Sequence, residues 1–253
     1  MQAPISVQLY SLREEAAADF PAVIERLGEV GFAGVEPAGL HGLSPAEFRR
    51  HVEAAGMAVS SVHGPLPLGD EANRVLDAQQ ELGCAALVVA MLPPDRFADD
   101  DAVKAAADDL NRAHENVRER GLELGYHNHW WEFEALYGGR TAHERLFELL
   151  DPQIFAEVDI YWARVGGGDP ARVIADLGPR ARLLHVKDGP ADDSRAPMTA
   201  VGDGTIDIKA ALGAGGAVEW HIVELDRCEG DMFAAIAKSY RYLTGSGLSK
   251  GRR

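Results

Sequence analysis

The sequence is poor in cysteine and in basic residues. Its 253 residues include two cysteines, Cys84 and Cys228, and neither belongs to a Cys-x-x-Cys pattern. A disulfide framework and a structural zinc site are therefore disfavoured, and we expect a reducing, cytoplasmic location. Lys and Arg number 25 against 40 Asp and Glu, which gives a formal net charge of −15. This balance disfavours binding to nucleic acid, because a protein that displaces counterions from phosphates needs concentrated Lys and Arg.

The sequence also lacks long hydrophobic runs and several catalytic motifs. No apolar run reaches the roughly 18 residues that a membrane helix needs, and residues 1–7 lack the order of a signal peptide, so we expect no membrane contact. No Gly-x-Gly-x-x-Gly turn follows the first β-rich run, which disfavours a dinucleotide-binding open sheet. There is no Gly-x-Ser-x-Gly elbow, and neither cysteine lies beside a histidine that could activate it. Nucleophilic hydrolase chemistry is therefore disfavoured.

What is present is an alternation of short β-rich runs and amphipathic stretches. Apolar residues make up 46% of the chain, enough for a sizeable core. The expected strands are 5–10, 34–37, 58–63, 85–91, 122–127, 154–159, 183–187 and 218–224. The expected helices are 19–30, 44–55, 73–82, 101–120, 141–150, 170–177, 206–212 and 232–243. Several strands are almost wholly apolar, which is typical of parallel sheets buried on both faces. The sequence predicts a single α/β domain, a (β/α)8 TIM barrel, over residues 1–244, with a flexible tail at 245–253.

Polar side chains stand where these strands end, at the face of a TIM barrel that carries the active site. They include Gln8, Glu36 and His63 on the first three strands and His127, Asp159, His185 and Glu224 on the last four. Two imidazoles and two carboxylates that converge from four consecutive strands predict a divalent metal site, and they fit Mn, Co, Fe or Zn better than Ca or Mg. The alternative is a metal-free polar mouth that binds substrate through hydrogen bonds.

Other polar and aromatic residues each have two possible interpretations. His129, Trp130 and Trp131 follow the fifth strand, and their rings could stack on a sugar or form a partner surface. Lys187 shares a face with His185 and could anchor or polarise a substrate, or pair with Asp159 or Asp188. His63 could bind substrate or metal, or be an ordinary loop histidine. The Gly-rich stretch 201–204 contains Asp203, which would repel a phosphate, so a neutral sugar is the simpler interpretation.

Several motifs together resemble the xylose isomerase-like TIM barrel superfamily, which includes sugar phosphate isomerases and epimerases. They are Val7–Arg13 (VQLYSLR), Gly31–Glu36 (GFAGVE), Gly125–His129 (GYHNH) with Glu132-Phe133, Val158–Trp162 (VDIYW), Leu184–Asp188 (LHVKD), Val201–Gly204 (VGDG) and Ile222–Glu224 (IVE). The resemblance implies a divalent metal held by Glu, Asp, His and Glu at the ends of strands five to eight. Asp159, His185 and Glu224 match the last three positions. His127 stands at the first, where Glu is usual, so Glu132 is also a candidate for the fourth ligand.

The resemblance further implies an enzyme that moves a proton next to the carbonyl of a small keto sugar or cyclitol, with one divalent ion (Mn, Co, Fe, Zn or Mg) as cofactor. Glu132, Lys187 and Glu224 are the candidate catalytic groups. The substrate contacts expected are Glu36, His63, His129 and Trp162. The partner is a small carbohydrate, and a homo-oligomer is compatible with the fold.

Three alternatives remain at this point. A dehydratase or lyase of an inosose or 3-keto sugar would use the same proton abstraction. A non-catalytic sugar-binding barrel would keep the aromatic mouth without working metal or acid–base groups. The third alternative is a barrel similar to endonuclease IV. The resemblance to that family would imply a three-metal site with a second histidine three residues after the Asp of the sixth strand, but Trp162 occupies that position here.

Overall fold

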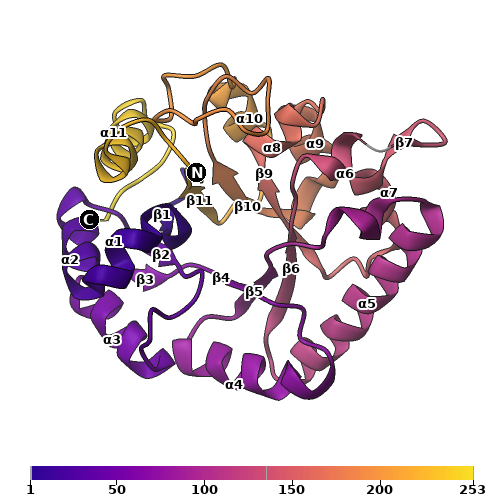
Figure 1. Ribbon diagram of the computed structural model, residues 1–253, viewed down its shortest axis with the longest axis horizontal. Coiled ribbons are helices and arrows are strands. Elements are labelled where there is room, and N and C mark those ends of the chain that lie inside the picture. Colours follow the sequence, from indigo (N-terminus) through magenta and orange to yellow (C-terminus); the bar gives the residue numbers. More distant parts are fainter. Residues whose placement is uncertain (1, 135, 253) are drawn as a thin grey trace.

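Parallel strands form a nearly closed ring in the computed structural model, which describes residues 2–134 and 136–252 (Figure 1). The order around the ring is β3-β2-β1-β11-β10-β9-β6-β5-β4, and every pairing in it is parallel. The strands are β1 Ile5–Gln8, β2 Gly34–Glu36, β3 Ala58–Val59, β4 Val62–Gly64, β5 Ala86–Val89, β6 Glu123–His127, β9 Phe155–Asp159, β10 Ala181–Val186 and β11 Trp220–Val223. A hairpin, β7 Leu136–Tyr137 with β8 Arg140–Thr141, lies outside the ring.

The two short strands β3 and β4 are halves of one position in the barrel. The sequence predicts a single strand over 58–63, but the structure interrupts it at Ser60 and Ser61. β3 pairs with β2 and β4 pairs with β5. The amide of Ser60 still donates to Val35 O, and the amide of His63 donates to Pro37 O. The nine strands therefore occupy eight positions, and the predicted TIM barrel is confirmed.

Helices surround this ring and cover the outer faces of the strands (Figure 1). Those predicted are found as α2 Phe20–Val30, α3 Pro45–Ala54, α4 Ala72–Leu82, α5 Asp100–Glu119, α7 Ala142–Leu149, α9 Pro170–Leu177, α10 Ile208–Ala214 and α11 Met232–Gly245. Capping explains several starts: Ser44 and Glu47 form a reciprocal capping box at α3, as their spacing predicts. Three short helices were not predicted: α1 Arg13–Ala18, α6 Trp131–Glu134 and α8 Ile160–Val165.

One glycine fixes the spacing of the strands that carry the site. Gly125 on β6 lies opposite Phe155 on β9. A Cβ atom at residue 125 would collide with the Phe155 ring, which is almost fully buried. Glycine therefore makes room for an aromatic ring inside the barrel while the two strands keep their hydrogen bonds.

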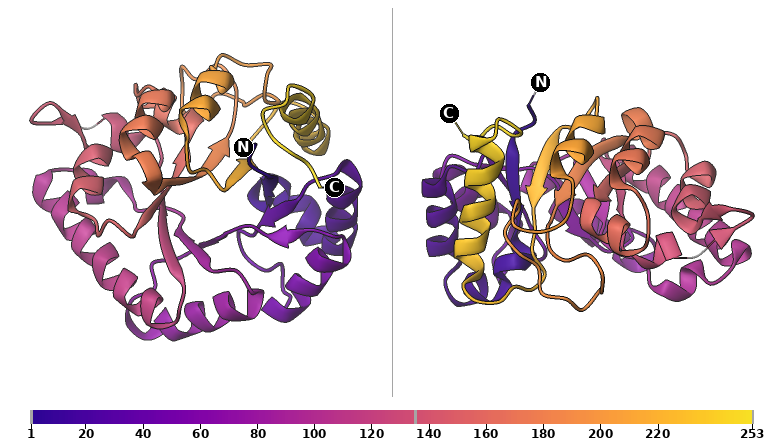
Figure 2. Two further views of the ribbon diagram at one scale, coloured as in Figure 1. Left: turned by 180° about the vertical axis from the view of Figure 1, so that it is seen from behind. Right: turned by 90° about the horizontal axis from the view of Figure 1, so that it is seen from above.

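The segment after α11 packs against the barrel, in contrast to the predicted flexible tail. Ile5 donates its amide to Lys250 O at 3.0 Å, and Lys250 donates to Ala3 O at 3.0 Å. Ser249 is buried, and its Oγ lies 2.8 Å from His221 Nδ1. These backbone bonds hold 248–252 beside the start of β1; Arg253 lies outside the described residues. The right-hand view of Figure 2 places both termini at one end of the barrel and the long orange loop after β10 at the other. Among the residues described, no helix is both long and apolar enough to span a membrane.

Candidate active site

The structure brings the four predicted metal ligands together. His127 ends β6, Asp159 ends β9, His185 lies near the end of β10, and Glu224 directly follows β11. These strands are neighbours in the ring, so their ends meet. One ligand atom from each residue falls within 4.8 Å of the others, and all four side chains are buried. We call these four residues the ligand group.

Local hydrogen bonds orient Asp159 within this group. Its Oδ1 accepts the amide of Trp162 at 2.8 Å and thereby caps α8. Oδ2 points the other way, 3.7 Å from His127 Nε2. The Asn128 side chain holds the Asp159 backbone through two bonds, of 3.0 and 3.2 Å. One carboxylate oxygen is thus used by the fold and the other faces the ligand group.

Lys187 places its ammonium between two members of the ligand group. Its Nζ lies 2.6 Å from Glu224 Oε2 and 2.9 Å from Asp159 Oδ2, with Asp226 Oδ2 at 3.2 Å. The side chain is 1% exposed. Burial lowers the pKa of Lys187, but the three carboxylates outweigh it and raise that pKa well above the usual value. Lys187 is therefore a buried cation, and the salt-bridge reading of the sequence holds alongside any chemical role.

A second layer of charged residues lies beneath the ligand group, and sequence reasoning missed its central member. Glu157 is fully buried on β9, and its Oε2 contacts His63 Nε2, His127 Nδ1 at 3.1 Å and His185 Nε2 at 3.2 Å. Glu36 Oε2 lies 2.7 Å from His185 Nε2 and accepts a 2.7 Å bond from Gln8. The signal for Glu157 was available, because a charged residue two positions before Asp159 points to the same barrel interior.

The two central histidines have opposite charge preferences. Burial lowers the pKa of His185, but Glu157, Glu224 and Glu36 outweigh it and raise the pKa well above normal. Burial, reinforced by the nearby charge of His185, lowers the pKa of His127 to about 3. His127 is therefore neutral at pH 7, the form that binds metals through a ring nitrogen.

Glu132 belongs to neither layer. Its Oε1 accepts the Tyr126 hydroxyl at 2.7 Å, and its Oε2 accepts the His129 amide at 3.0 Å. Burial raises the pKa of Glu132 to about 8. These contacts tie the loop after β6 to the barrel wall, and the carboxyl group does not reach into the ligand group as a fourth ligand in this structure.

Aromatic rings from two elements pack above the ligand group. The His129 ring stacks on Trp131 with centroids 4.4 Å apart, and its centroid is 5.1 Å from that of His127. Trp130 packs on Trp162 at 4.8 Å. Lys187 Nζ lies 5.4 Å from the Trp162 ring centroid. The predicted substrate residues His129 and Trp162 thus line the site's upper side, whereas Glu36 and His63 lie below it.

Asp188 organises the Gly-rich loop after β10. Its buried carboxylate accepts the amides of Gly189 and Ile206 on Oδ1 and those of Gly202 and Gly204 on Oδ2, at 2.8 to 3.1 Å. A Cβ on Gly204 would collide with the carboxylate. The loop therefore wraps its amides around a carboxylate supplied by the protein itself.

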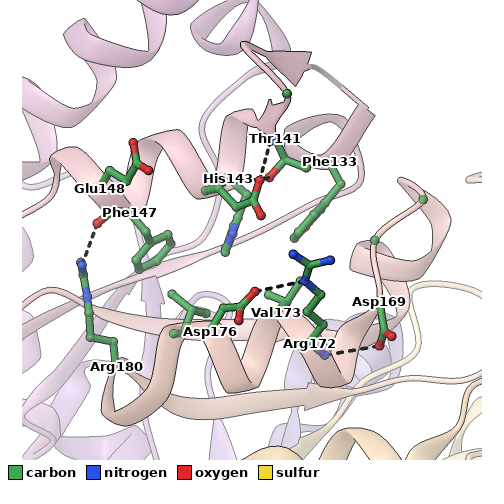
Figure 3. A pocket seen from close by; sticks show the side chains of 15 residues that line it. Phe133, Thr141, His143, Phe147, Glu148, Asp169, Arg172, Val173, Asp176 and Arg180 are labelled. Carbon is green, nitrogen blue, oxygen red and sulfur yellow. Dashed lines mark hydrogen bonds and ion pairs between the residues drawn. The ribbon is translucent and has the colours of Figure 1, made fainter.

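A separate surface cavity of about 590 Å³ lies between α7 and α9. Figure 3 shows Phe133, His143 and Phe147 on one side of it and Arg172 and Asp176 on the other. None of the predicted site residues lines it. The predicted metal-binding and acid–base residues lie at or just after the strand ends and not in this cavity.

Comparison with known proteins agrees with this architecture. A family model described as "Xylose isomerase-like TIM barrel" matches residues 24–225, and the chain belongs to that family. A sugar phosphate isomerase/epimerase from Parabacteroides distasonis is 26% identical, with a TM-score of 0.80 over 99% of this chain and 96% of that one. The probable 3-DHS dehydratase AsbF from Bacillus anthracis (12%, TM-score 0.74, 95% and 98% covered) and the IolI protein with a bound zinc atom (14%, 0.74, 98% and 98%) share the fold. Comparison with curated proteins gave no match.

Proposed function

We propose that the chain is a metal-dependent sugar isomerase or epimerase that transfers a proton next to the carbonyl of a small, uncharged keto sugar or cyclitol. The observation that carries the proposal is the ligand group: four buried donor atoms, from four neighbouring strands, within 4.8 Å of one another. The sugar phosphate isomerase/epimerase and zinc-bound IolI structures are consistent with it.

The donor set fits a divalent transition metal. Imidazole nitrogens and carboxylate oxygens, two of each here, are ligands that Mn, Co, Fe and Zn accept. Asp159 uses Oδ1 for helix capping, so Oδ2, which contacts the Lys187 ammonium, is the oxygen that would face an ion. His127, Asp159, His185 and Glu224 would hold it. When bound, the ion supplies positive charge against the negative charge that develops on a substrate oxygen.

Lys187 is the best-placed acid–base group of this chain. Its Nζ lies within 3 Å of two of the proposed ligands, so it borders any substrate that approaches them. An ammonium there can donate a hydrogen bond or a proton to a substrate oxygen. Glu224, whose carboxylate faces both His185 and Lys187, would act as ligand and as proton acceptor. Glu132 would act through His129, whose amide it holds.

The loop after β10 supports an uncharged substrate. In barrels that bind sugar phosphates, backbone amides of a Gly-rich loop near this position hold the phosphate. Here the amides of Gly202 and Gly204 already donate to Asp188. A phosphate would have to displace a buried carboxylate. We expect free sugars to be turned over at least as well as their phosphates.

A dehydratase remains the second candidate, and the likeness to the probable 3-DHS dehydratase supports it. Loss of water after proton abstraction requires an acid for the departing hydroxyl, and the Lys187 ammonium could serve. An unsaturated product that absorbs in the ultraviolet would identify a dehydratase. An epimer seen by NMR, with solvent deuterium at the carbon next to the carbonyl, would identify an isomerase or epimerase.

The testing experiment is elemental analysis and Mn²⁺ titration of the wild type and of Asp159→Asn. Asparagine keeps an oxygen to cap α8 but removes the carboxylate that would bind the ion. We expect one ion per chain in the wild type and none in the variant, with the fold retained by circular dichroism. Asp169→Asn is the matched control, because Asp169 caps α9 away from the site. A wild type that binds no ion would refute the proposal and favour a sugar-binding barrel.

A further inference from the structure

Two carboxylates and a third histidine lie directly below the ligand group. We call Glu36, His63 and Glu157 the lower layer. Glu157 precedes Asp159 by two residues on the same face of β9, which places it about 7 Å nearer the closed end of the barrel. Both carboxylates are fully buried, and Oε1 of each finds no hydrogen-bond partner among the described residues. Burying such groups costs free energy unless they are hydrogen-bonded or paired with an opposite charge.

The nitrogen atoms of His127 and His185 divide between the two layers. His127 directs Nε2 toward Asp159 Oδ2, at 3.7 Å, and Nδ1 toward Glu157 Oε2, at 3.1 Å. His185 directs Nδ1 toward Glu224 Oε2, at 2.7 Å. Its Nε2 lies 2.7 Å from Glu36 and 3.2 Å from Glu157. Each ring thus has one nitrogen above and one below.

A neutral imidazole carries one lone pair and one N–H, so a ring that gives its lone pair to an ion must place its N–H on the other side. We infer that Glu157 and Glu36 are positioning residues for the metal centre. With the ion bound, they would accept the N–H groups of His127 and His185 and so fix His127 to bind through Nε2 and His185 through Nδ1. The inference rests on the proposed function, since it assumes an ion in the ligand group. Partners of this kind fix the tautomer and raise the basicity of metal-binding histidines.

The lower layer could instead bind an ion of its own. Atoms of His63, His127, Glu157 and His185 also lie within 4.8 Å of one another. Occupying both groups would require His127 and His185 to give both nitrogens, and a neutral ring has only one lone pair. Glu157 Oε2 already contacts three imidazoles. We therefore expect one ion per chain, held by the upper group.

The experiment compares Glu157→Gln with wild type and Asp159→Asn. Calorimetric titration with Mn²⁺ gives the affinity, and elemental analysis gives the stoichiometry. We expect Glu157→Gln to bind one ion about 10–100-fold more weakly than wild type, whereas Asp159→Asn loses it. In Zn²⁺-loaded wild type, long-range proton–nitrogen NMR should show His127 protonated at Nδ1 and His185 at Nε2. Glu157→Gln should lose the fixed His127 tautomer.

Gln79→Met is the matched control. The Gln79 side chain is also buried and donates to Cys84 O and Ala86 O at the start of β5, at the opposite end of the barrel. Gln79→Met should lower the free energy of unfolding without changing the affinity for Mn²⁺ or the NMR signals of the histidines. If Glu157 had only a structural role, Glu157→Gln would give the same result as this control.

The outcomes separate the two proposals. A wild type without an ion refutes the proposed function. A wild type that binds one ion, with an unchanged affinity in Glu157→Gln, refutes only the inference. Two ions per chain, or an ion lost in Glu157→Gln and kept in Asp159→Asn, would make Glu157 a ligand and also overturn it.

Discussion

Replacement of Lys187 by methionine should lower the free energy of unfolding of the metal-free protein and should lower the Kd for the divalent ion. Methionine keeps the length and the buried apolar stem of lysine but removes the charge. In the structure the ammonium lies 2.6 and 2.9 Å from Glu224 and Asp159, two of the proposed ligands. Removing one partner of a buried ion pair typically costs about 3–5 kcal/mol, because the remaining charge is left uncompensated. We expect a loss of that order in the metal-free variant.

A bound divalent ion would supply the missing charge. The stability lost without metal then returns as binding free energy, and about 3 kcal/mol corresponds to a roughly hundredfold lower Kd. Thermal melts with and without Mn²⁺, together with calorimetric titration, measure both effects. Turnover should fall sharply despite the tighter binding, since the proposed acid is gone. The matched control is Lys238→Met, whose exposed partner is Asp203, and which should change stability by less than about 1 kcal/mol.

Unchanged or weaker Mn²⁺ binding by Lys187→Met would refute the reasoning. It would mean that the ammonium does not compete with the ion for Asp159 and Glu224. An unchanged melting temperature without metal would refute the first half, that the ammonium stabilises these carboxylates.

Three further predictions concern stability. Burial raises the pKa of Glu132 from 4.5 to about 8, so between these pH values the folded chain holds a proton that the unfolded chain has released. The free energy of unfolding should therefore fall by about 5 kcal/mol as the pH rises across this window. Glu132→Gln should flatten this part of the stability–pH curve. Gly204→Ala should lower the unfolding free energy by about 1–3 kcal/mol, measured by urea denaturation, because the new methyl group collides with the Asp188 carboxylate. Gly125→Ala should destabilise by at least as much through its collision with Phe155, and an unchanged urea midpoint in either variant would contradict the packing described.

The sequence predicted the barrel well because each signal was local. Ser44 and Glu47 mark a helix start through a capping box, and the apolar runs mark buried parallel strands. The break at Ser60 and Ser61 could not be read in the same way, because the interruption depends on how the third strand pairs with neighbours on each side. The packing of 248–252 beside β1 likewise depends on contacts that are distant in the chain.

The candidate site was only partly predictable for the same reason. Strand ends are marked by polar residues, so the ligand group was predicted and is found together. Glu157 was missed although it lies within a predicted strand, since attention to strand ends overlooks the layer below. Glu132 stands five residues after His127, which suggested a ligand or base, but a hydroxyl and an amide take up its carboxyl group. Partners of this kind come from the folded chain.

An excess of buried negative charge explains why one site holds a lysine and would also recruit an ion. The barrel centre gathers five carboxylates, those of Glu36, Glu157, Asp159, Glu224 and Asp226. The cations facing them are Lys187 and His185, whose pKa values these carboxylates raise. Burial together with repulsion between Glu36 and Glu157 raises the pKa of Glu36. So many carboxylates in a low-dielectric interior favour any cation that can enter. Lys187 supplies part of this positive charge from within the chain. Its third partner, Asp226, would still pair with the ammonium if an ion bound to Asp159 and Glu224. A lysine held in this way would stay beside the substrate as a proton donor, which links the electrostatics of the barrel centre to the chemistry proposed for it.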